Sequence, residues 1–171
     1  VIKGIKFEGQ KVYGDVNEFA KKYYQDGADE IIFIDTVASL YGRNKLDEVI
    51  NYATKNIFVP ICVEGGIKSL DNCKEILKKG ADKIALNTNA ILNKKLINEC
   101  SLSIGSQSLV ISIQAKKRSE NKWEPLYLNG REPSRLDLID WIKECEQLGA
   151  GERFLSSVYK DGTEHGPDFN L

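Results

Sequence analysis

Residues 27–35 read Gly-Ala-Asp-Glu-Ile-Ile-Phe-Ile-Asp, a short turn followed by an apolar run that ends in a carboxylate. The turn pattern returns at Gly80-Ala81-Asp82-Lys83 and at Gly149-Ala150-Gly151-Glu152. Each copy follows an amphipathic segment and precedes a β-branched run, so the glycine ends a helix and the next residues lead the chain into a strand. The sequence therefore repeats one unit of helix, turn and strand.

Five runs are expected to form buried strands of a parallel sheet, because their apolar character is nearly continuous. They cover residues 31–35, 58–64, 84–88, 109–114 and 153–158. Asp15 with Glu18, Ser69 and Ser134 are helix start signals between or before these strands. Alternating strands and helices predict an α/β fold, either an open doubly wound sheet or a (βα)8 barrel. No Gly-x-Gly-x-x-Gly follows the first run, which disfavours dinucleotide binding.

The composition excludes several classes of protein. The 171 residues carry a net charge of -1, so no nucleic-acid partner is expected. No apolar run approaches the ~18 residues of a membrane span, so no membrane partner is expected either. One histidine and four dispersed cysteines provide no common metal set, and we expect no metal, no cofactor, and reduced thiols in the cytoplasm. The length suits a single domain, 1–171, although the chain starts with Val1 rather than Met.

One long polar segment interrupts the repeat. Residues 116–133 contain a charged run, an apolar run from Trp123 to Leu128, and the turn pair Asn129-Gly130. This pattern predicts a hairpin-like insert after the fourth strand. Its charges are interpreted as a solvated face, with a ligand contact as the alternative.

Polar residues follow each of the five expected strands. They are Asp35; Glu64, Gly65 and Gly66; Asn87 and Thr88; Gln114 and Lys116; and Ser156 and Ser157, followed by Asp161, Gly162 and Thr163. Because the active sites of parallel βα folds lie at the carboxyl ends of the strands, this set indicates a site there.

Two pairs within this set suggest a phosphate site. Backbone N–H groups at Gly65 and Gly66 would face a phosphate ahead of a helix, and Asn87 and Thr88 would add side-chain donors. The alternative for the glycine pair is a tight turn between strand and helix.

The carboxylates of the set also have two interpretations. Asp161 precedes a glycine just past the last strand, where it would serve acid–base chemistry or belong to an ordinary turn. Asp35 ends an apolar run, where an unpaired charge is costly, so it is either functional or paired within the structure.

The opposite end of the fold carries three charges. Glu30, Lys83 and Glu152 occupy the same place in the repeat, at the start of their strands. In a closed barrel they would meet at the amino-terminal mouth, where they would pair into a ring that plugs the base or gates a small molecule. The alternative is three separately solvated charges.

These residues together resemble the cyclase subunit of imidazole glycerol phosphate synthase, from histidine biosynthesis. The matching stretches are 1–4, 27–30, 33–35 with Ala38 and Ser39, 65–67, 80–83, 87–88, 105–107, 115–116, 149–152 and 161–163. The resemblance implies a ribulose-phosphate-binding (βα)8 TIM barrel of about 250 residues. The match covers about strands 2–6, so we expect an internal piece of such a barrel, inactive and not stably monomeric by itself.

The family enzyme takes ammonia from a glutaminase subunit, passes it through the barrel, and converts a phosphorylated aminoimidazole carboxamide nucleotide into imidazole glycerol phosphate and aminoimidazole carboxamide ribotide. The resemblance assigns substrate or phosphate binding to Lys3, Asp35, Gly65, Gly66, Asn87, Thr88, Gly162 and Thr163, with Lys3 in a mobile loop over the site. It assigns an ammonia gate to Glu30, Lys83 and Glu152, and the glutaminase interface to Asp82. Gln114 and Asp161 are the candidate catalytic residues.

Two residues depart from the family pattern. Gln114 stands where the family has a catalytic aspartate, and glutamine cannot exchange a proton at neutral pH. Glu64 replaces the first glycine of a Gly-Gly-Gly. These changes, with residues 37–43, also resemble paralogues that channel ammonia for amidation of a surface-polysaccharide sugar. A non-catalytic barrel that activates a glutaminase, and the sister isomerase of the pathway, are further alternatives, although Ala38, Ser39, Asn87 and Thr88 favour the cyclase.

Overall fold

The computed structural model describes residues 1–36 and 46–171. Five parallel strands form the centre: β3 (Ile31–Ile34), β4 (Ile61–Glu64), β5 (Lys83–Leu86), β6 (Leu109–Ser119) and β9 (Glu152–Ser157). Each pairs in parallel with the next in that order, so the chain order equals the spatial order. The predicted α/β fold with a partial barrel is therefore confirmed, with strand bounds shifted by up to three residues except at the end of β6, which extends five residues further. Residues 37–43, with Ala38 and Ser39, lie outside the described part of the chain.

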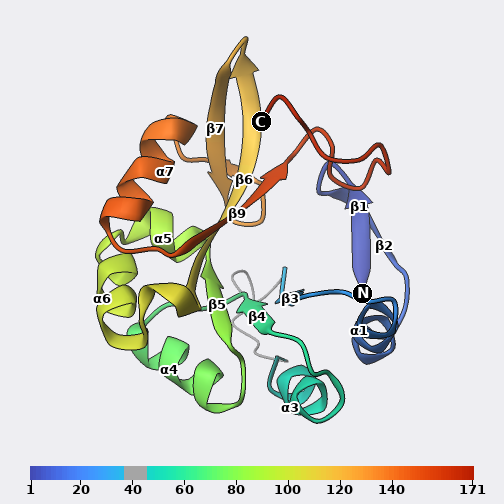
Figure 1. The fold of residues 1–171 in the computed structure, drawn as a ribbon. Helices are drawn as coiled ribbons and strands as arrows, with labels where there is room; N and C mark the ends of the chain where they lie inside the picture. Colours follow the sequence, from blue (N-terminus) through green and yellow to red (C-terminus); the bar gives the residue numbers. More distant parts are fainter. Residues whose placement is uncertain (37–45) are drawn as a thin grey trace.

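Helices surround the outside of the curved sheet (Figure 1). They are α1 (Val16–Gln25), α3 (Leu46–Asn56), α4 (Leu70–Lys78), α5 (Thr88–Leu92), α6 (Lys95–Ile104) and α7 (Leu138–Gln147), with one 3-10 turn at Ser106–Ser108. Their apolar faces cover outward-pointing strand residues such as Phe33, Val63 and Ile111 in one large core. A second, small cluster of Cys62, Ala85 and Val110 lies on the other face of the sheet, inside the barrel.

Two of the three predicted helix starts are confirmed. The Asp15 carboxylate accepts hydrogen bonds from the N–H groups of Asn17 and Glu18, and the Ser69 hydroxyl accepts one from Asn72 N–H. The third predicted helix start, at Ser134, was wrong.

The last helix begins after Asp137 rather than after Ser134. The Asp137 carboxylate accepts hydrogen bonds from the N–H groups of Ile139 and Asp140, and a charged acceptor stabilises a helix start more than a hydroxyl does. The Ser134 hydroxyl instead accepts from Leu136 N–H, around a residue with positive φ that cannot continue a helix.

The long strand β6 carries a hairpin beyond the barrel. Its first half pairs with β5, and from Gln114 onward it pairs antiparallel with β7 (Lys122–Tyr127), which in turn pairs with β8 (Glu132–Pro133). Figure 1 shows this hairpin extending past the ends of the other strands. Glu124 anchors it: its buried carboxylate pairs with Arg118 and accepts a 2.6 Å hydrogen bond from Arg135 N–H.

An N-terminal hairpin stands where the resemblance implied a mobile loop. Strands β1 (Ile2–Ile5) and β2 (Glu8–Val12) pair antiparallel and form a separate two-stranded sheet. The hairpin lies beside the segment that follows β9, since Lys6 N–H donates a 2.9 Å hydrogen bond to Asp161 O. No helix among the described residues is long and apolar enough to cross a membrane.

Candidate functional site

The carboxyl ends of β3 to β6 surround a small cavity of about 40 Å³. Its lining includes seven of the residues singled out from the sequence: Asp35, Glu64, Gly65, Gly66, Asn87, Thr88 and Gln114. Sequence reasoning did not assign three polar lining residues to the site, Thr36, Asn89 and Asn129. The expected gathering of strand-end residues is thus what the fold produces, because parallel neighbours end at the same edge.

Glu64 is the most perturbed of these groups. Its side chain is on the inner face of β4 and only 6% exposed. Burial raises the pKa of the Glu64 carboxyl from 4.5 to about 7, and a side-chain hydrogen bond with Ser112 opposes that rise. One oxygen, Oε2, is buried and has no hydrogen-bond partner among the described residues. A carboxyl with a pKa near neutrality and a free lone pair is suited to proton exchange or to holding a cation.

Gln114 shares this condition. It is 6% exposed on β6, and its Oε1 is the other strand-end oxygen that is buried without a partner within the described chain. Buried polar atoms are normally satisfied, so two unpaired acceptors lining one cavity point to a ligand that supplies donors.

The glycine pair is a tight turn with a required geometry. Gly65 has φ +127°, and a Cβ there would lie 2.7 Å from the backbone oxygen of Asp35. Position 65 therefore requires glycine, because the backbone there approaches the end of β3 too closely for a side chain. Helix α4 starts only at Leu70, capped by Ser69, so the pair does not form the helix N-terminus itself.

Asn87 and Thr88 already have structural partners. The Asn87 amide donates to the carbonyls of Ser112 at 3.0 Å and Leu126 at 3.1 Å. The Thr88 hydroxyl accepts from Leu128 N–H at 3.1 Å. These bonds join β5 to β6 and to the end of the β7 strand, so both side chains shape the cavity wall.

A larger cleft of about 940 Å³ adjoins the small cavity between β3, β9, β1 and α1. Asp35, Gln114 and Asn129 line both spaces. Lys3 and Asp161 also line the cleft, and their side chains form an ion pair.

Gly162 and Thr163 line neither the small cavity nor the larger cleft. The Gly4 carbonyl oxygen occupies the position that a Cβ of Gly162 would need. The Thr163 hydroxyl donates a 2.8 Å hydrogen bond to Lys160 O.

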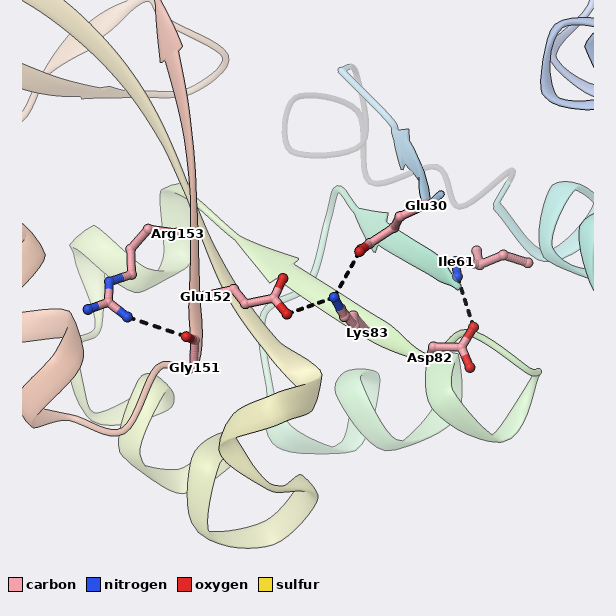
Figure 2. Close-up of polar contacts among 7 residues, drawn as sticks. All are labelled: Glu30, Ile61, Asp82, Lys83, Gly151, Glu152 and Arg153. Atoms are coloured by element: carbon pink, nitrogen blue, oxygen red, sulfur yellow. Dashed lines mark hydrogen bonds and ion pairs between the residues drawn. The ribbon is translucent and has the colours of Figure 1, made fainter. Parts of the chain in front are cut away.

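The three charges at the opposite end do meet. Lys83 Nζ lies 2.8 Å from Glu30 Oε2 and 2.7 Å from Glu152 Oε1, bridging β3 and β9 through β5 (Figure 2). Hydrogen bonds with Glu152 and with Glu30 raise the pKa of Lys83, so the lysine stays charged. Beside the ring, Asp82 accepts a 2.8 Å hydrogen bond from Ile61 N–H and remains exposed (Figure 2).

Cys62 lies between the ring and Glu64 inside the barrel. It shares a register row with Lys83 and is two residues before Glu64 on the same face of β4. Burial, together with the charges of Glu30 and Glu64, raises the pKa of the Cys62 thiol to about 12. The thiol is therefore neutral and inert, part of an apolar layer between two polar ones. No group of side chains that could hold a metal ion occurs within residues 1–36 and 46–171.

Parallel βα units with polar residues at the carboxyl ends of their strands and a charge ring at the other end define part of a βα barrel, a fold whose active sites lie at the carboxyl end. The chain belongs to the histidine biosynthesis protein family, whose model matches residues 1–171. It is 47% identical over 171 residues to the imidazole glycerol phosphate synthase subunit HisF of Legionella pneumophila, covering all of this chain and 81% of that protein. It is 44% identical over 172 residues to the HisF subunit of Lactococcus lactis and 41% identical over 171 residues to that of Dictyoglomus thermophilum. The chain spans 66% and 68% of these two relatives, and the resemblance noted from the motifs is confirmed.

Proposed function

We propose that this chain belongs to the cyclase subunit of an imidazole glycerol phosphate synthase. In that reaction ammonia from a glutaminase and a phosphorylated nucleotide yield imidazole glycerol phosphate and aminoimidazole carboxamide ribotide. The observation that carries the proposal is the similarity along the whole chain to curated HisF subunits. The enzyme class that follows is a lyase-type cyclase acting without a resident cofactor.

The amino-terminal end of the barrel is proposed as the entrance for ammonia. Lys83 bridges Glu30 and Glu152 there, with the Lys83 side chain only 18% exposed. Breaking one ion pair would open the ring without unfolding a strand, since the three side chains come from three different strands. We place the glutaminase subunit against this end, with the exposed Asp82 at its interface.

The carboxyl-terminal mouth is proposed as the substrate site. One phosphate would lie at the turn of Gly65 and Gly66, bordered by Asn87 and Thr88. Because both of those side chains already hold the cavity wall, backbone N–H groups would supply most of the donors. The second phosphate would lie near Gly162 and Thr163, across the larger cleft.

The larger cleft would hold the body of the substrate between these phosphates. Its volume of about 940 Å³ lies in the range of small-molecule sites. Lys3 and Asp35 line it and would contact the substrate. Of the two carboxylates that line the cleft, Asp161 is the one to which we assign acid–base chemistry, and its ion pair with Lys3 holds it in the cleft wall.

The test is ammonia-dependent turnover by the protein at its natural length, with ammonium chloride replacing the glutaminase and both products followed by mass spectrometry. We expect turnover that Asp161→Asn reduces by about 10²-fold or more, the usual contribution of acid–base catalysis. The exposed Glu120→Gln is the matched control and should leave turnover unchanged. Absence of turnover in the wild-type protein would contradict the proposal.

The presence of Gln114 favours a second candidate function, in which the protein delivers ammonia to a different acceptor, such as a sugar. Its amide cannot take or give a proton at neutral pH, which removes one acid–base group from the mouth. If the wild type is inactive on the nucleotide but Gln114→Asp gains activity, the cyclase chemistry was lost at this position. If stimulation of a glutaminase persists without turnover, ammonia delivery becomes the favoured function.

A further inference from the structure

Two unpaired acceptors share the small cavity at the mouth of the barrel. Glu64 Oε2 and Gln114 Oε1 are both buried, and neither has a hydrogen-bond partner among residues 1–36 and 46–171. Both side chains are 94% buried, and both line the same cavity of about 40 Å³. A buried acceptor left without a donor is costly, so the arrangement is suited to a ligand that brings donors and needs few acceptors in return.

The size of the cavity restricts that ligand. A water-sized molecule needs about 10–15 Å³, so the space beside Glu64 and Gln114 holds one or a few such molecules rather than the body of a nucleotide substrate. The cavity also adjoins the larger cleft through Asp35 and Gln114, which line both. A small ligand bound there would thus stand next to a larger substrate.

We infer that Glu64 and Gln114 form a receiving site for ammonia, where it is held before it reacts. Two N–H groups of ammonia would donate to Glu64 Oε2 and Gln114 Oε1, leaving the nitrogen lone pair directed toward the cleft. The carboxyl and the ammonia share one proton, as carboxylate with ammonium or as carboxylic acid with ammonia. This inference rests on the proposed use of ammonia, and it assigns a positive role to both residues that depart from the family pattern.

The surroundings match a donor-rich, compact nitrogen species. The other charged group lining the small cavity is Asp35, an acceptor at the end of β3. Below Glu64 lie the neutral thiol of Cys62 and then the ring of Lys83 with its two carboxylates. The Ser112 side chain already forms a hydrogen bond with the Glu64 carboxyl. This bond orients the carboxyl and leaves Oε2 for the ligand.

The first test measures binding without relying on turnover. The Glu64 carboxyl is followed by ¹³C NMR in the natural-length protein with labelled glutamate, and Glu64→Gln assigns its signal. Saturating ammonium chloride should lower the pKa of Glu64 by about one unit, a tenfold change in proton affinity, since a bound cation favours the carboxylate. Tetramethylammonium chloride and potassium chloride at equal ionic strength should not do so.

Matched variants and kinetics complete the test. Gln114→Met keeps the length of the side chain but removes the acceptor, so it should abolish the ammonium effect while Glu64 still titrates. With ammonium as the nitrogen source, Glu64→Gln should raise the KM for ammonium about tenfold and leave the KM for the nucleotide unchanged. No ammonium-specific change in the Glu64 titration, or an equal change with potassium, would overturn the inference even if turnover is observed. Turnover that is absent while the NMR change is present would instead count against the proposed reaction and support the site.

Discussion

Replacing Glu64 with glutamine should change how the stability of the protein depends on pH. Folding raises the pKa of this carboxyl from 4.5 to about 7 because it is buried. The folded state therefore binds more protons than the unfolded state between these two values. By linkage, the wild-type protein loses stability as the pH rises through that window, and above pH 7 the loss is complete.

The size of the effect follows from the shift. A change from 4.5 to about 7 is worth roughly 3 kcal/mol at about 1.4 kcal/mol per unit, as an order of magnitude. Most of it, about 2–3 kcal/mol, should appear between pH 5 and pH 8. The glutamine side chain is neutral at every pH and keeps a polar group facing Ser112. From pH 5 to pH 8 the free energy of unfolding of Glu64→Gln should therefore rise by this amount relative to that of the wild type.

The assay is reversible urea unfolding of both natural-length proteins at half-unit steps from pH 5 to pH 8.5. Only the pH-dependent difference in the free energy of unfolding is compared, since glutamine brings its own burial cost at all pH values. Glu120→Gln, which removes one exposed carboxylate from the hairpin turn, is the control and should follow the wild type. A constant difference between Glu64→Gln and the wild type would refute the reasoning, because it would mean that Glu64 titrates alike in both states.

Three further changes test other parts of the fold. Lys83→Met leaves two facing carboxylates without their cation and should cost about 1–2 kcal/mol at pH 7, as measured by urea unfolding. Asn87→Ala leaves two buried carbonyls without their donor and should cost about 2–4 kcal/mol, with faster amide exchange in β7 as the specific readout. Asp137→Ala should cost about 1 kcal/mol through loss of the helix cap, whereas Ser134→Ala should be nearly neutral; equal losses would contradict the assignment of the cap.

The barrel strands were predictable because local chemistry and tertiary position agree in them. Residues 109–113 of β6 are buried on both faces, as their continuous apolar character predicts, whereas Ile34 at the end of β3 is 43% exposed. The same repeat predicted the ring, since residues at equivalent repeat positions lie at the start of every second parallel strand, β3, β5 and β9. Glu30, Lys83 and Glu152 could thus be brought together from spacing alone.

The N-terminal hairpin was missed because its turn carries no signal. Lys6 and Phe7 both have positive φ, 54° and 64°, a conformation that usually selects glycine or asparagine. The hairpin is held instead by tertiary contacts, such as the bond from Lys6 N–H to Asp161 O. Contacts between residues so far apart in the sequence leave no local pattern.

The roles of the polar strand ends were also beyond the reach of spacing. Asn87 donates to Leu126 O, 39 positions away, and this partner exists only because β6 continues into the hairpin. Likewise Glu64 and Gln114 differ from an ordinary polar pair only through the burial that leaves each with one unpaired oxygen. Sequence gives the residue types at the mouth; three-dimensional packing decides which of their atoms remain available.

The order of layers inside the barrel bears on how ammonia would be handled. The inner face carries an apolar layer of Cys62, Ala85 and Val110, in which Cys62 is level with Lys83 in the strand register and the other two are level with Glu64. A charged ammonium would pay a large desolvation cost in such a layer, whereas neutral ammonia would not. Ammonia that crosses would therefore arrive neutral, and a carboxyl whose pKa lies near 7 is the group that can meet it in either protonation state. An aspartate exposed to solvent at this position would be ionised at neutral pH and would favour ammonium, which has no lone pair for attack. The burial of Glu64 is thus the property on which its proposed role depends.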